Sequence, residues 1–430
     1  MATPFWYNAA LALIKPLYKS KIKKRAETTE QFQQECLERF GPFQPVKNRQ
    51  AIWFHVVSVG ETNAAQPLIE HYLKAGHPVL VTNTTKTGQA RAKSLFLKAP
   101  YLDLFQAVYL PADQKPLVRQ FFALYQPKLL ALVETEIWPN LIAQAGQSQV
   151  PCILINARLS EKSAKGYAKV SSLTQPMLQG LDQLLAQDRA TAERFIQLGA
   201  APSVTQVVGS IKFDIHAPES AVKQAAQLNH EWSLAGRKII TIASTHAPEE
   251  QKLLSAFKPY LDTQPELLCI VVPRHPERFD EVFAVAQSLN LNTTRRSTGQ
   301  SIEAETQVYL ADSMGEMWLW YALSNACFVG GSLNEPGGGH NILEPIALHV
   351  PTVLGKNYFN FQTIVDEFVQ ADAVKVVEDA EQAAAVLMIL LDDAEQANTL
   401  NQAAQKIMQL NTGSLKKHIQ VIDAYLSIGA

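Results

Sequence analysis

Short, continuous apolar runs recur along this chain and alternate with segments of helix length. The first is Ala51–Val57, and the clearest of the others span residues 79–82, 128–133, 152–156, 238–243 and 267–272. Continuous apolar character, in place of strict alternation, is typical of strands that are covered on both faces, as in a parallel sheet. Strands that alternate with helices in this way predict an α/β protein with parallel sheets. One helix is expected from near Asn63 to Leu73, another over 378–408, and residues 352–355 are expected to be the last strand.

The series of strands ends near residue 208 and restarts at residue 238, which indicates two domains divided near Gly209–Pro218. The length of 430 residues agrees, because two domains of about 200 residues are expected for such a chain. The net charge of −2 provides no basic field, so no nucleic-acid partner is expected. The four cysteines form no Cys-x-x-Cys pair, and three of them lie in apolar runs, which predicts core residues in a reducing compartment.

The N-terminal residues are apolar and aromatic, and a basic cluster follows them. Phe5–Tyr18 is shorter than the about 20 residues of a membrane-spanning helix, and Lys15 and Pro16 interrupt it. A signal peptide carries its positive charge before the apolar part, whereas here Lys19, Lys21, Lys23, Lys24 and Arg25 come after it. We predict an interfacial segment on an anionic membrane, with the rest of the chain on the cytoplasmic side. An ordinary first helix packed on the protein is the alternative.

One apolar run, residues 326–329, leads into a glycine-rich loop, and Asn341 can cap the helix that is predicted to follow. Glycines let a backbone approach an anion, and free N–H groups at a helix start attract phosphate. Glu344 falls in the first helical turn, where its carboxylate can bind the hydroxyls of a ribose. A tight turn between strand and helix is the alternative, because a short glycine motif has little specificity.

Carboxylates cluster at predicted strand ends in the first half of the chain. Glu61 follows Ala51–Val57 at a helix start, and Glu134 and Glu136 close the run 128–133. Ligands of open α/β sheets bind beyond the carboxyl ends of the strands, so Glu61 is the candidate general base. A helix-start glutamate favoured by the helix dipole is the alternative. Lys212, where the two halves meet, is a candidate to neutralise a substrate carboxylate, or else a solvated hinge residue.

Arginine and histidine take these places in the second half. Pro273–Arg278 contains two arginines and a histidine after the run 267–272, and arginine is suited to phosphate oxygens. Ser313–Glu316 is a further polar segment at a strand end. The sequence has no Asp-x-Asp, His-Glu-x-x-His or P-loop motif, so no metal or cofactor is expected. The charge on a leaving phosphate would then be stabilised by Arg, Lys and backbone N–H groups.

Eight of these stretches together resemble the 3-deoxy-D-manno-octulosonic acid (Kdo) transferases of Gram-negative lipopolysaccharide synthesis. They follow the family's order over nearly the whole chain, and eight ordered motifs are more specific than any one. The matching stretches are Val57–Glu61, Glu134–Asn140, Ile155–Ser160, Gly209–Asp214, Ala243–His246, Pro273–Arg278, Met314–Glu316 and Gly338–Pro345. Two positions depart from the family's usual pattern. Ser210 stands where an asparagine is usual, and Glu335-Pro336-Gly337 stands where an arginine is usual, which changes the charge beside the donor phosphate.

The resemblance implies a GT-B glycosyltransferase fold, with two Rossmann-like domains facing a central cleft. It implies a membrane-associating segment at residues 1–25, an acceptor domain at 26–210, a donor domain for CMP-Kdo at 211–410 and a C-terminal helix at 411–430 that packs back on the first domain. The implied acceptor is the tetra-acylated lipid A precursor (lipid IVA), met at the cytoplasmic face of the inner membrane.

The resemblance also implies residue roles. Glu61 matches the catalytic base, and Glu134 and Lys212 match positions that stabilise the transition state. The implied donor-binding residues are Pro273, Arg274, Met314, Gly315, Glu316, Asn341, Ile342, Leu343 and Glu344. We expect a single inverting displacement in which Glu61 deprotonates a sugar hydroxyl of the acceptor. The phosphate of CMP is then held by Arg274 and by the helix start at Asn341.

Basic residues are expected to meet the phosphates of the acceptor. They are the N-terminal basic cluster together with Arg158, Lys162 and Lys165. Two other functions remain open at this point: another GT-B enzyme, such as an epimerase or a transferase that uses a UDP-sugar, and a non-catalytic membrane-bound scaffold. The sequence predicts neither the number of Kdo residues transferred nor the roles of Glu136 and His275.

Overall fold

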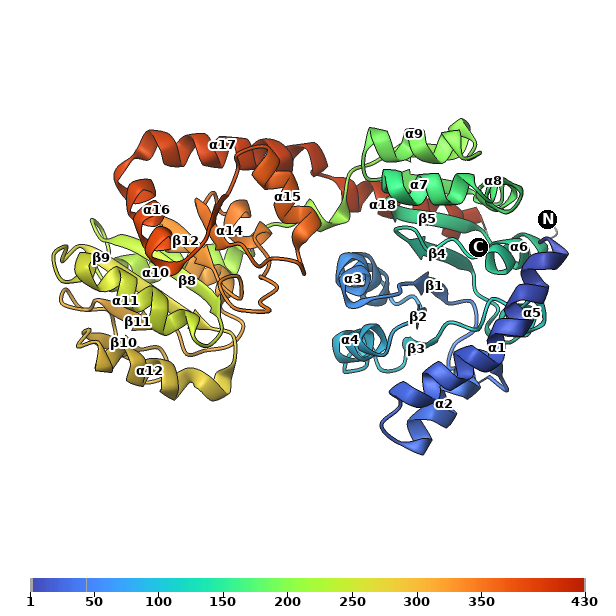
Figure 1. The fold of residues 1–430 in the computed structure, drawn as a ribbon, viewed down its shortest axis with the longest axis horizontal. Helices are drawn as coiled ribbons and strands as arrows, with labels where there is room; N and C mark the ends of the chain where they lie inside the picture. The colour runs from blue at the N-terminus through green and yellow to red at the C-terminus, as the bar shows by residue number, and fades with distance from the viewer. Residues whose placement is uncertain (1–2, 44, 429–430) are drawn as a thin grey trace. The chain divides into compact units, whose positions relative to one another are not determined.

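The computed structural model describes residues 3–43 and 45–428 and divides the chain into two compact units (Figure 1). The first unit comprises Met1–Asp214 and Asn411–Ala430, and the second comprises Ile215–Leu410. Each unit is built on one seven-stranded sheet whose neighbouring strands are parallel. The predicted fold class, two α/β domains with parallel sheets, is confirmed.

The first sheet has the strand order β3-β2-β1-β4-β5-β6-β7. Its strands are β1 (Ile52–His55), β2 (Val79–Asn83), β3 (Phe105–Tyr109), β4 (Leu129–Val133), β5 (Cys152–Ala157), β6 (Gln183–Ala186) and β7 (Thr205–Val207). The helices of this unit are α1 (Phe5–Arg25), α2 (Thr29–Phe40), α3 (Val59–Lys74), α4 (Lys86–Phe96), α5 (Lys115–Tyr125), α6 (Pro139–Gln147), α7 (Glu161–Ala168), α8 (Ser171–Gln179), α9 (Arg189–Gln197) and α18 (Ser414–Ile428), with the 3-10 turns η1 (Pro202–Val204) and η2 (Ile211–Phe213).

The second sheet has the order β10-β11-β9-β8-β12-β13-β14. Its strands are β8 (Lys238–Thr245), β9 (Leu267–Pro273), β10 (Thr293–Arg295), β11 (Val308–Leu310), β12 (Ala326–Val329), β13 (Thr352–Gly355) and β14 (Lys375–Val377). The helices are α10 (Glu219–Glu231), α11 (Glu249–Leu261), α12 (Phe279–Ser288), α13 (Met317–Ala322), α14 (Leu343–Ala347), α15 (Gln362–Gln370), α16 (Ala380–Asp392) and α17 (Ala394–Asn411), with the 3-10 turn η3 (Pro276–Arg278).

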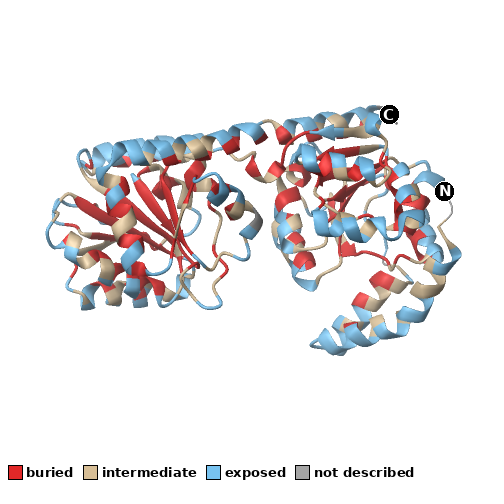
Figure 2. Cartoon of the chain, turned by 45° about the horizontal axis from the view of Figure 1, so that its top comes forward, coloured by how far each residue is buried: buried red, intermediate tan, exposed pale blue. Residues whose placement is uncertain are grey.

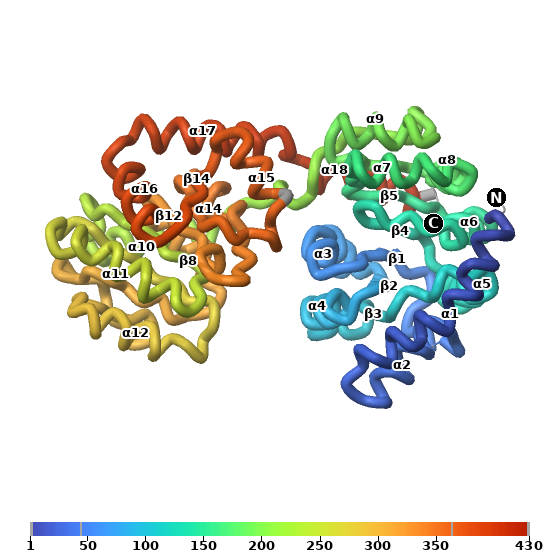
Figure 3. The backbone as a smooth tube through the Cα atoms, in the orientation of Figure 1, coloured from blue at the N-terminus to red at the C-terminus, as the bar shows by residue number. Residues whose placement is uncertain are grey.

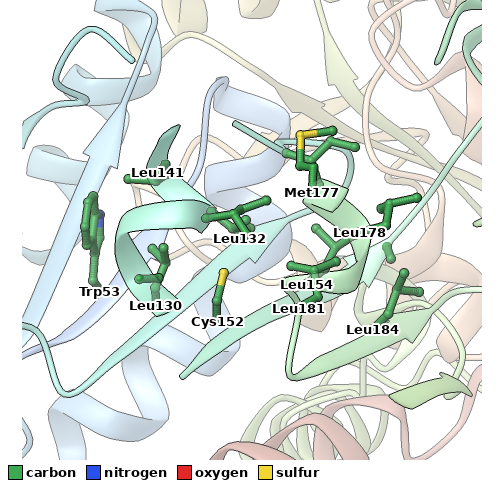
Figure 4. Close-up of a cluster of buried hydrophobic side chains, with 14 of the residues drawn as sticks. Trp53, Leu130, Leu132, Leu141, Cys152, Leu154, Met177, Leu178, Leu181 and Leu184 are labelled. Atoms are coloured by element: carbon green, nitrogen blue, oxygen red, sulfur yellow. The ribbon is translucent and has the colours of Figure 1, made fainter. Parts of the chain in front are cut away.

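The central strands are mostly apolar because helices cover both faces of each sheet. Alternate residues of one strand enter different cores: Leu130 and Leu132 of β4 pack in one cluster, whereas Leu129 and Ala131 pack in the cluster on the other face. Figure 4 shows the first cluster, in which Leu130, Leu132 and Leu154 of the sheet meet Met177 and Leu178 of α8. The burial view in Figure 2 shows the same layering, with buried strands inside and exposed outer faces on the helices.

The direction of winding reverses at one point in each sheet. In the first sheet, β1 has β2 on one side and β4 on the other; in the second, β8 lies between β9 and β12. Ligands of open α/β sheets bind beyond the carboxyl ends of the strands at such a reversal. The ends of β1 and β4, and the ends of β8 and β12, are therefore the places where each unit is able to hold a ligand.

Three local predictions are wrong. The helix expected from Asn63 starts at Val59, because Ser58 Oγ accepts the Glu61 N–H and caps it. Residues 352–355 are not the last strand, since β14 follows at Lys375–Val377. The helix expected over 378–408 is interrupted, because Asp393 leaves helical geometry and its carboxylate accepts the Gln396 N–H at 2.9 Å to start α17.

The N-terminal helix α1 is continuous through Pro16. Among residues 3–43 and 45–428, no helix is both long enough and apolar enough to cross a membrane. At the other end of the chain, α18 lies in the first unit (Figure 3) and packs on α3, where Tyr72 OH donates to Asp423 at 3.0 Å. All four cysteines are free, and the three in strands are buried, as predicted.

Candidate active site

Glu61 lies in the first turn of α3, directly beyond the end of β1. Its carboxylate accepts the Val57 N–H at 2.7 Å and the Ser58 hydroxyl at 3.0 Å, so it does serve the helix start as the alternative interpretation expected. Burial, together with the charges of Glu136 and Glu134, raises the pKa of Glu61 to about 7, although the Val57 N–H and the Ser58 hydroxyl lower it. A carboxyl group with a pKa near neutrality is suited to take a proton from a substrate and return it to water.

Glu134 and Lys212 form an ion pair across this end of the sheet. Lys212 Nζ lies 2.6 Å from Glu134 Oε1, and both side chains are largely shielded from solvent. Glu134 has a φ of +60°, and its backbone N–H donates to the carbonyl of Ile155 at 3.1 Å. The structure thus brings together Glu134 and Lys212, which are 78 positions apart in the sequence, and each neutralises the other's charge.

Glu136 has a partner that the sequence analysis missed. Its Oε2 accepts the Trp138 Nε1–H at 3.1 Å and lies 3.8 Å from Nε2 of His55, which is completely buried. The signal for His55 was its position as the one imidazole in an otherwise apolar strand. Of the three clustered carboxylates, Glu134 faces Lys212 and Glu136 faces His55. Glu61, the third of these carboxylates, has no cationic or imidazole partner among the described residues.

The segment that carries Lys212 is held in place by the C-terminal helix. Asn156 has a φ of +49°; its side-chain oxygen accepts the Ile211 N–H at 3.1 Å, and its own N–H donates to Nε2 of His418 at 3.0 Å. His418 Nδ1 donates in turn to the Ser414 carbonyl at 2.7 Å, and burial lowers the pKa of His418 to about 4, so the ring stays neutral. No local pattern pointed to His418, because it lies 262 residues from Asn156.

In the second unit, a buried carboxylate occupies much of the glycine loop. Glu249 Oε2 accepts the N–H groups of His246 and Gly331, and Oε1 accepts those of Ser332 and Leu333, at 2.7–3.0 Å. The expectation that the loop's N–H groups are free for phosphate is wrong for these residues. Gly331 also permits close packing, since a Cβ at its φ of +66° would lie 2.9 Å from the ring of His340.

The end of the loop retains donors for an anion. Within the described part of the chain, the N–H groups of His340 and Asn341 have no acceptor. Asn341 Oδ1 accepts the Leu343 N–H at 3.1 Å, and Asn341 Nδ2 donates to Glu344 at 3.3 Å. Asn341 is not the cap that was expected, because the N-cap of α14 is Ile342 and the helix has no side-chain cap hydrogen bond. The side chains of Ile342 and Leu343 are buried in the core, so these two predicted donor-binding residues offer only their backbone. Burial raises the pKa of Glu344.

Arg274 is exposed after β9, beyond the buried Pro273, and has no carboxylate partner among the residues that the structure describes. Arg278 differs, because Glu250 binds its guanidinium at 2.7 and 3.1 Å. Two histidines lie near Arg274. The rings of His246 and His340 stack with centroids 5.1 Å apart and share a hydrogen bond of 2.8 Å between their Nε2 atoms. Burial, and then the charges of His246, Arg274 and His275, lower the pKa of His340 to about 4.

The segment Met314–Glu316 presents one exposed and one paired side chain. Met314 is 57% exposed, and Gly315 turns the chain with a φ of +85°. Glu316 accepts two hydrogen bonds from Arg296, at 3.2 and 2.8 Å. Burial raises the pKa of Glu316, but the bonds from Arg296 and Ser313 outweigh this and lower it overall. Arg296 was not predicted, and its ion pair leaves Glu316 neutralised.

Solved structures share this fold. The UDP-GlcNAc 2-epimerase of Neisseria meningitidis, bound to UDP-GlcNAc, matches 87% of this chain and 99% of its own with a TM-score of 0.52 and 13% identity. A putative UDP-N-acetylglucosamine 2-epimerase of Listeria monocytogenes covers 88% and 97%, with a TM-score of 0.51 and 13% identity. At such identity the likeness shows the fold alone. The two parallel α/β units have the GT-B glycosyltransferase fold, as predicted.

Relatives in sequence are closer. The family described as 3-Deoxy-D-manno-octulosonic-acid transferase (kdotransferase) matches residues 34–215. The 3-deoxy-D-manno-octulosonic acid transferase of Haemophilus influenzae is 34% identical over 98% of both chains, and that of Bordetella pertussis is 33% identical over 98% and 99%. The C-terminal CMP-Kdo binding domain of WaaA from Acinetobacter baumannii is 62% identical, covers 45% of this chain and 100% of its own, and has a TM-score of 0.44. The chain belongs to the Kdo transferases, the glycosyltransferases of lipopolysaccharide biosynthesis that its motifs resemble.

Proposed function

We propose that the chain transfers Kdo from CMP-Kdo to a sugar hydroxyl of the tetra-acylated lipid A precursor, with inversion at the anomeric carbon. One observation carries the proposal: at the reversal point of the first sheet, Glu61 is the carboxylate left without a cation, and its pKa of about 7 suits a base. The choice of donor is supported by the 62% identity to a domain described as CMP-Kdo binding.

In the proposed reaction, Glu61 takes the proton of the acceptor hydroxyl as its oxygen attacks the anomeric carbon. The bond from that carbon to the phosphate oxygen of CMP breaks, and its electron pair leaves with CMP. Arg274 and the free N–H groups of His340 and Asn341 stabilise the departing phosphate. The carboxylate of Glu134 stabilises the positive charge that develops on the sugar ring, and its partner Lys212 counters the Kdo carboxylate. Attack opposite the leaving group inverts the configuration.

No metal is assigned a role in this proposal. In the part of the chain that the structure describes, no group of three or more His, Cys, Asp and Glu side chains is arranged to hold one. The charge of the leaving phosphate then falls to the arginine and the backbone donors named above. A chelator such as EDTA is expected to leave the rate of Kdo transfer unchanged, and a loss restored by Mg²⁺ would contradict this.

The lipid nature of the acceptor is supported by α1. This helix binds the first unit through polar side chains: Tyr7 OH donates to Asp113 at 2.8 Å, and Asn140 Nδ2 donates to Asn8 at 3.0 Å. Ile22 is buried, but other apolar side chains of this helix face solvent, and Phe5, Leu13 and Leu17 are 87%, 79% and 71% exposed. A packed helix with an outward apolar face, followed by basic residues, fits the surface of an anionic membrane. We propose that this surface is the cytoplasmic face of the inner membrane.

A recess beside Glu136 fits an amphipathic acceptor. Its volume is about 310 Å³, and it is lined mostly by aromatic and aliphatic side chains from α1, the β4–α6 loop, α7 and α8. Tyr7, Ile137, Trp138 and Leu173 are among them. A larger recess of about 870 Å³ near Gln50 and Lys128 contains neither Glu136 nor any other residue of the β4–α6 loop. The smaller one is therefore the better candidate for part of the lipid.

The decisive experiment is transfer of Kdo from CMP-Kdo, generated in the assay, to a tetra-acylated lipid A precursor. Glu61→Gln is assayed beside the native chain, and calorimetry checks that it still binds CMP. Product from the native chain alone supports both the reaction and the base, and product masses count the sugars added. No product from the native chain, with binding of UDP in place of CMP, would instead favour another GT-B enzyme.

Charge reversal tests the acceptor phosphates. Reversing Arg158 and Lys162 is expected to raise the Michaelis constant for the acceptor and leave CMP affinity intact. Lys252 of α11, exposed in the second unit, is a matched control whose reversal should leave both unchanged. An unchanged acceptor constant in the Arg158 and Lys162 variants would refute the assignment of these two residues.

A further inference from the structure

A fully buried histidine lies behind the proposed base. His55 ends β1, and its Nδ1 lies 2.9 Å from Thr82 Oγ1 and 3.1 Å from the Thr82 carbonyl oxygen. Its Nε2 has no hydrogen-bond partner among the described residues and lies 3.8 Å from Oε2 of Glu136. A buried polar atom without a hydrogen bond costs free energy of folding. The position of this imidazole nitrogen opposite a carboxylate therefore calls for a functional explanation.

The carboxylate of Glu136 favours the tautomer whose ring hydrogen lies on Nε2, because the other tautomer would direct a lone pair at a carboxylate oxygen. Thr82 is compatible with this tautomer: its Oγ1 accepts the Trp53 Nε1–H at 2.8 Å, and its hydroxyl hydrogen is available to His55 Nδ1 at 2.9 Å. At 3.8 Å the contact is too long for a hydrogen bond, so His55 acts on Glu136 through its charge distribution.

We propose that His55 and Glu136 are a positioning pair that sets the protonation of Glu61. This inference rests on the proposed function, in which Glu61 is the base. The geometry supports it because Lys212 neutralises Glu134 at 2.6 Å, whereas the more distant His55 offsets only part of the charge on Glu136. The charge that remains on Glu136 acts on Glu61 and adds to the larger effect of burial, which favours a proton on Glu61.

Few charged groups surround Glu61, and the pair of His55 and Glu136 is the one whose charge is only partly offset. Glu136 and Glu134 are the charged groups that act on Glu61; both belong to the β4–α6 loop, and Lys212 of η2 and His55 of β1 act on them in turn. The helices α4 and α18 also pack on α3, and neither brings a described charge that acts on Glu61. The start of α3 contributes only the Val57 N–H and the Ser58 hydroxyl.

The proposal predicts opposite effects for the two partners. Glu136→Gln removes the facing charge while keeping an oxygen for the Trp138 N–H, so Glu61 ionises more easily. The acidic limb of the kcat/KM profile should then move to lower pH, by about 0.5–1 pH unit. His55→Leu leaves the charge of Glu136 less offset, so the limb should move to higher pH. In the double variant, His55→Leu should have no further effect, because the charge on which it acts is gone.

The test is the pH profile of kcat/KM for the full-length native chain and these variants, with thermal unfolding as a check on folding. His55→Gln, which keeps a side-chain N–H, should lie between the native chain and His55→Leu. A purely structural role predicts lower rates or melting temperatures with no movement of the limb. An unmoved limb in Glu136→Gln, or shifts of the same sign in both single variants, would overturn the proposal.

A second measurement separates this inference from the proposed function. The carboxyl carbon of Glu61, labelled with ¹³C and assigned by its absence in Glu61→Gln, titrates in an NMR experiment that needs no turnover. If Glu61→Gln keeps native activity, Glu61 is not the base and the proposed mechanism fails, even where the titration moves; if the native chain transfers no Kdo, the proposed function fails. If Glu61→Gln is inactive and the titration ignores both Glu136→Gln and His55→Leu, only the role of the pair is overturned.

Discussion

Glu61 and Glu249 occupy comparable places in the two units, and the protein treats them differently. Each lies at the start of the helix that follows the first strand of its sheet, Glu61 in α3 after β1 and Glu249 in α11 after β8. Burial raises the pKa of both carboxyl groups. Glu61 accepts one backbone N–H and one hydroxyl, whereas Glu249 accepts four backbone N–H groups and is completely buried.

The difference shows how one residue type serves chemistry in one unit and architecture in the other. Each oxygen of Glu249 already accepts two N–H groups, so no lone pair is left for a substrate and the side chain organises the loop after β12. Glu61 keeps lone pairs unoccupied, and its neighbours Glu134 and Glu136 are matched by Lys212 and His55. A raised pKa thus identifies a candidate base only where hydrogen bonds leave room for a proton to be exchanged.

The largest effect is expected from Glu61→Gln. The amide keeps an oxygen for the Val57 N–H, so the start of α3 is retained, but it cannot accept a proton from the acceptor. Loss of a general base should lower kcat by about 10²–10⁴-fold, with CMP affinity and melting temperature close to native. Steady-state kinetics and calorimetry measure the two effects. A variant that keeps more than a tenth of the native kcat would remove Glu61 from the mechanism.

Glu249→Gln should instead damage the second unit. Whichever way the amide is oriented, its NH₂ group faces two backbone N–H groups that formerly had an acceptor. Two buried donors without a partner cost about 2–4 kcal/mol of unfolding free energy. Chemical denaturation measures this, and weaker CMP binding should accompany it. Glu281→Gln, at an exposed pair with Arg278, is the control and should cost less than about 0.5 kcal/mol.

The features of the two units that depend on local sequence patterns were predictable. Apolar runs placed the strands, and the polar residues that follow them placed Glu61, Glu134 and the loop after β12. The pattern Ser58-x-x-Glu61 is also a capping signal, and it could have placed the start of α3 correctly. These inferences succeed because strand burial and helix capping depend on residues within a few positions of one another.

The rest depends on contacts between distant segments. The hydrogen bonds from the loop to Glu249 join residues that are 82–84 positions apart in the sequence, and the hydrogen bond between Asn156 and His418 joins residues 262 positions apart. Whether a glycine-rich loop has free N–H groups is decided by such a contact, which is why the expectation for Gly331 failed. The pairing of Arg296 with Glu316 is similar, because only the fold shows that a residue near β10 meets the start of α13.

A smaller effect is expected at Arg274, which has no carboxylate partner among the described residues. Arg274→Ala removes a charge-assisted contact to the donor phosphate and should weaken CMP binding about 10–100-fold. Arg274→Lys keeps the charge without the planar fork, so its loss should be smaller. Calorimetry with CMP measures both. If Arg278→Ala weakened CMP binding at native stability and Arg274→Ala did not, the roles of the two arginines would be exchanged.

The smallest effect is a change of pH on the native chain. Because Glu61 acts only when deprotonated, and its pKa is about 7, kcat/KM should rise with pH through neutrality and level off above it. One pH unit below the pKa the rate should be about tenfold below the plateau. The profile is measured with saturating CMP-Kdo and limiting acceptor. A plateau that extends below pH 5 would show that the active base has an ordinary carboxyl pKa.

The raised pKa of Glu61 must also make the free energy of unfolding depend on pH, and the direction of that dependence follows from the direction of the shift. The folded state holds the proton of Glu61 more tightly than the unfolded chain, whose carboxyl has a pKa near 4.5, so the stabilising contribution is complete below pH 4.5 and is lost as pH rises through about 7. Native stability relative to Glu61→Gln should therefore fall by about 1–3 kcal/mol over this window. Glu281→Gln should show no such fall, because Glu281 is exposed and Arg278 lowers its pKa. A constant difference in stability between the native chain and Glu61→Gln would mean that Glu61 is no more protonated in the folded protein than in the unfolded chain. Glu61 would then not differ in its protonation from an ordinary carboxylate, and the distinction drawn between it and the paired Glu134 and Glu136 would fail.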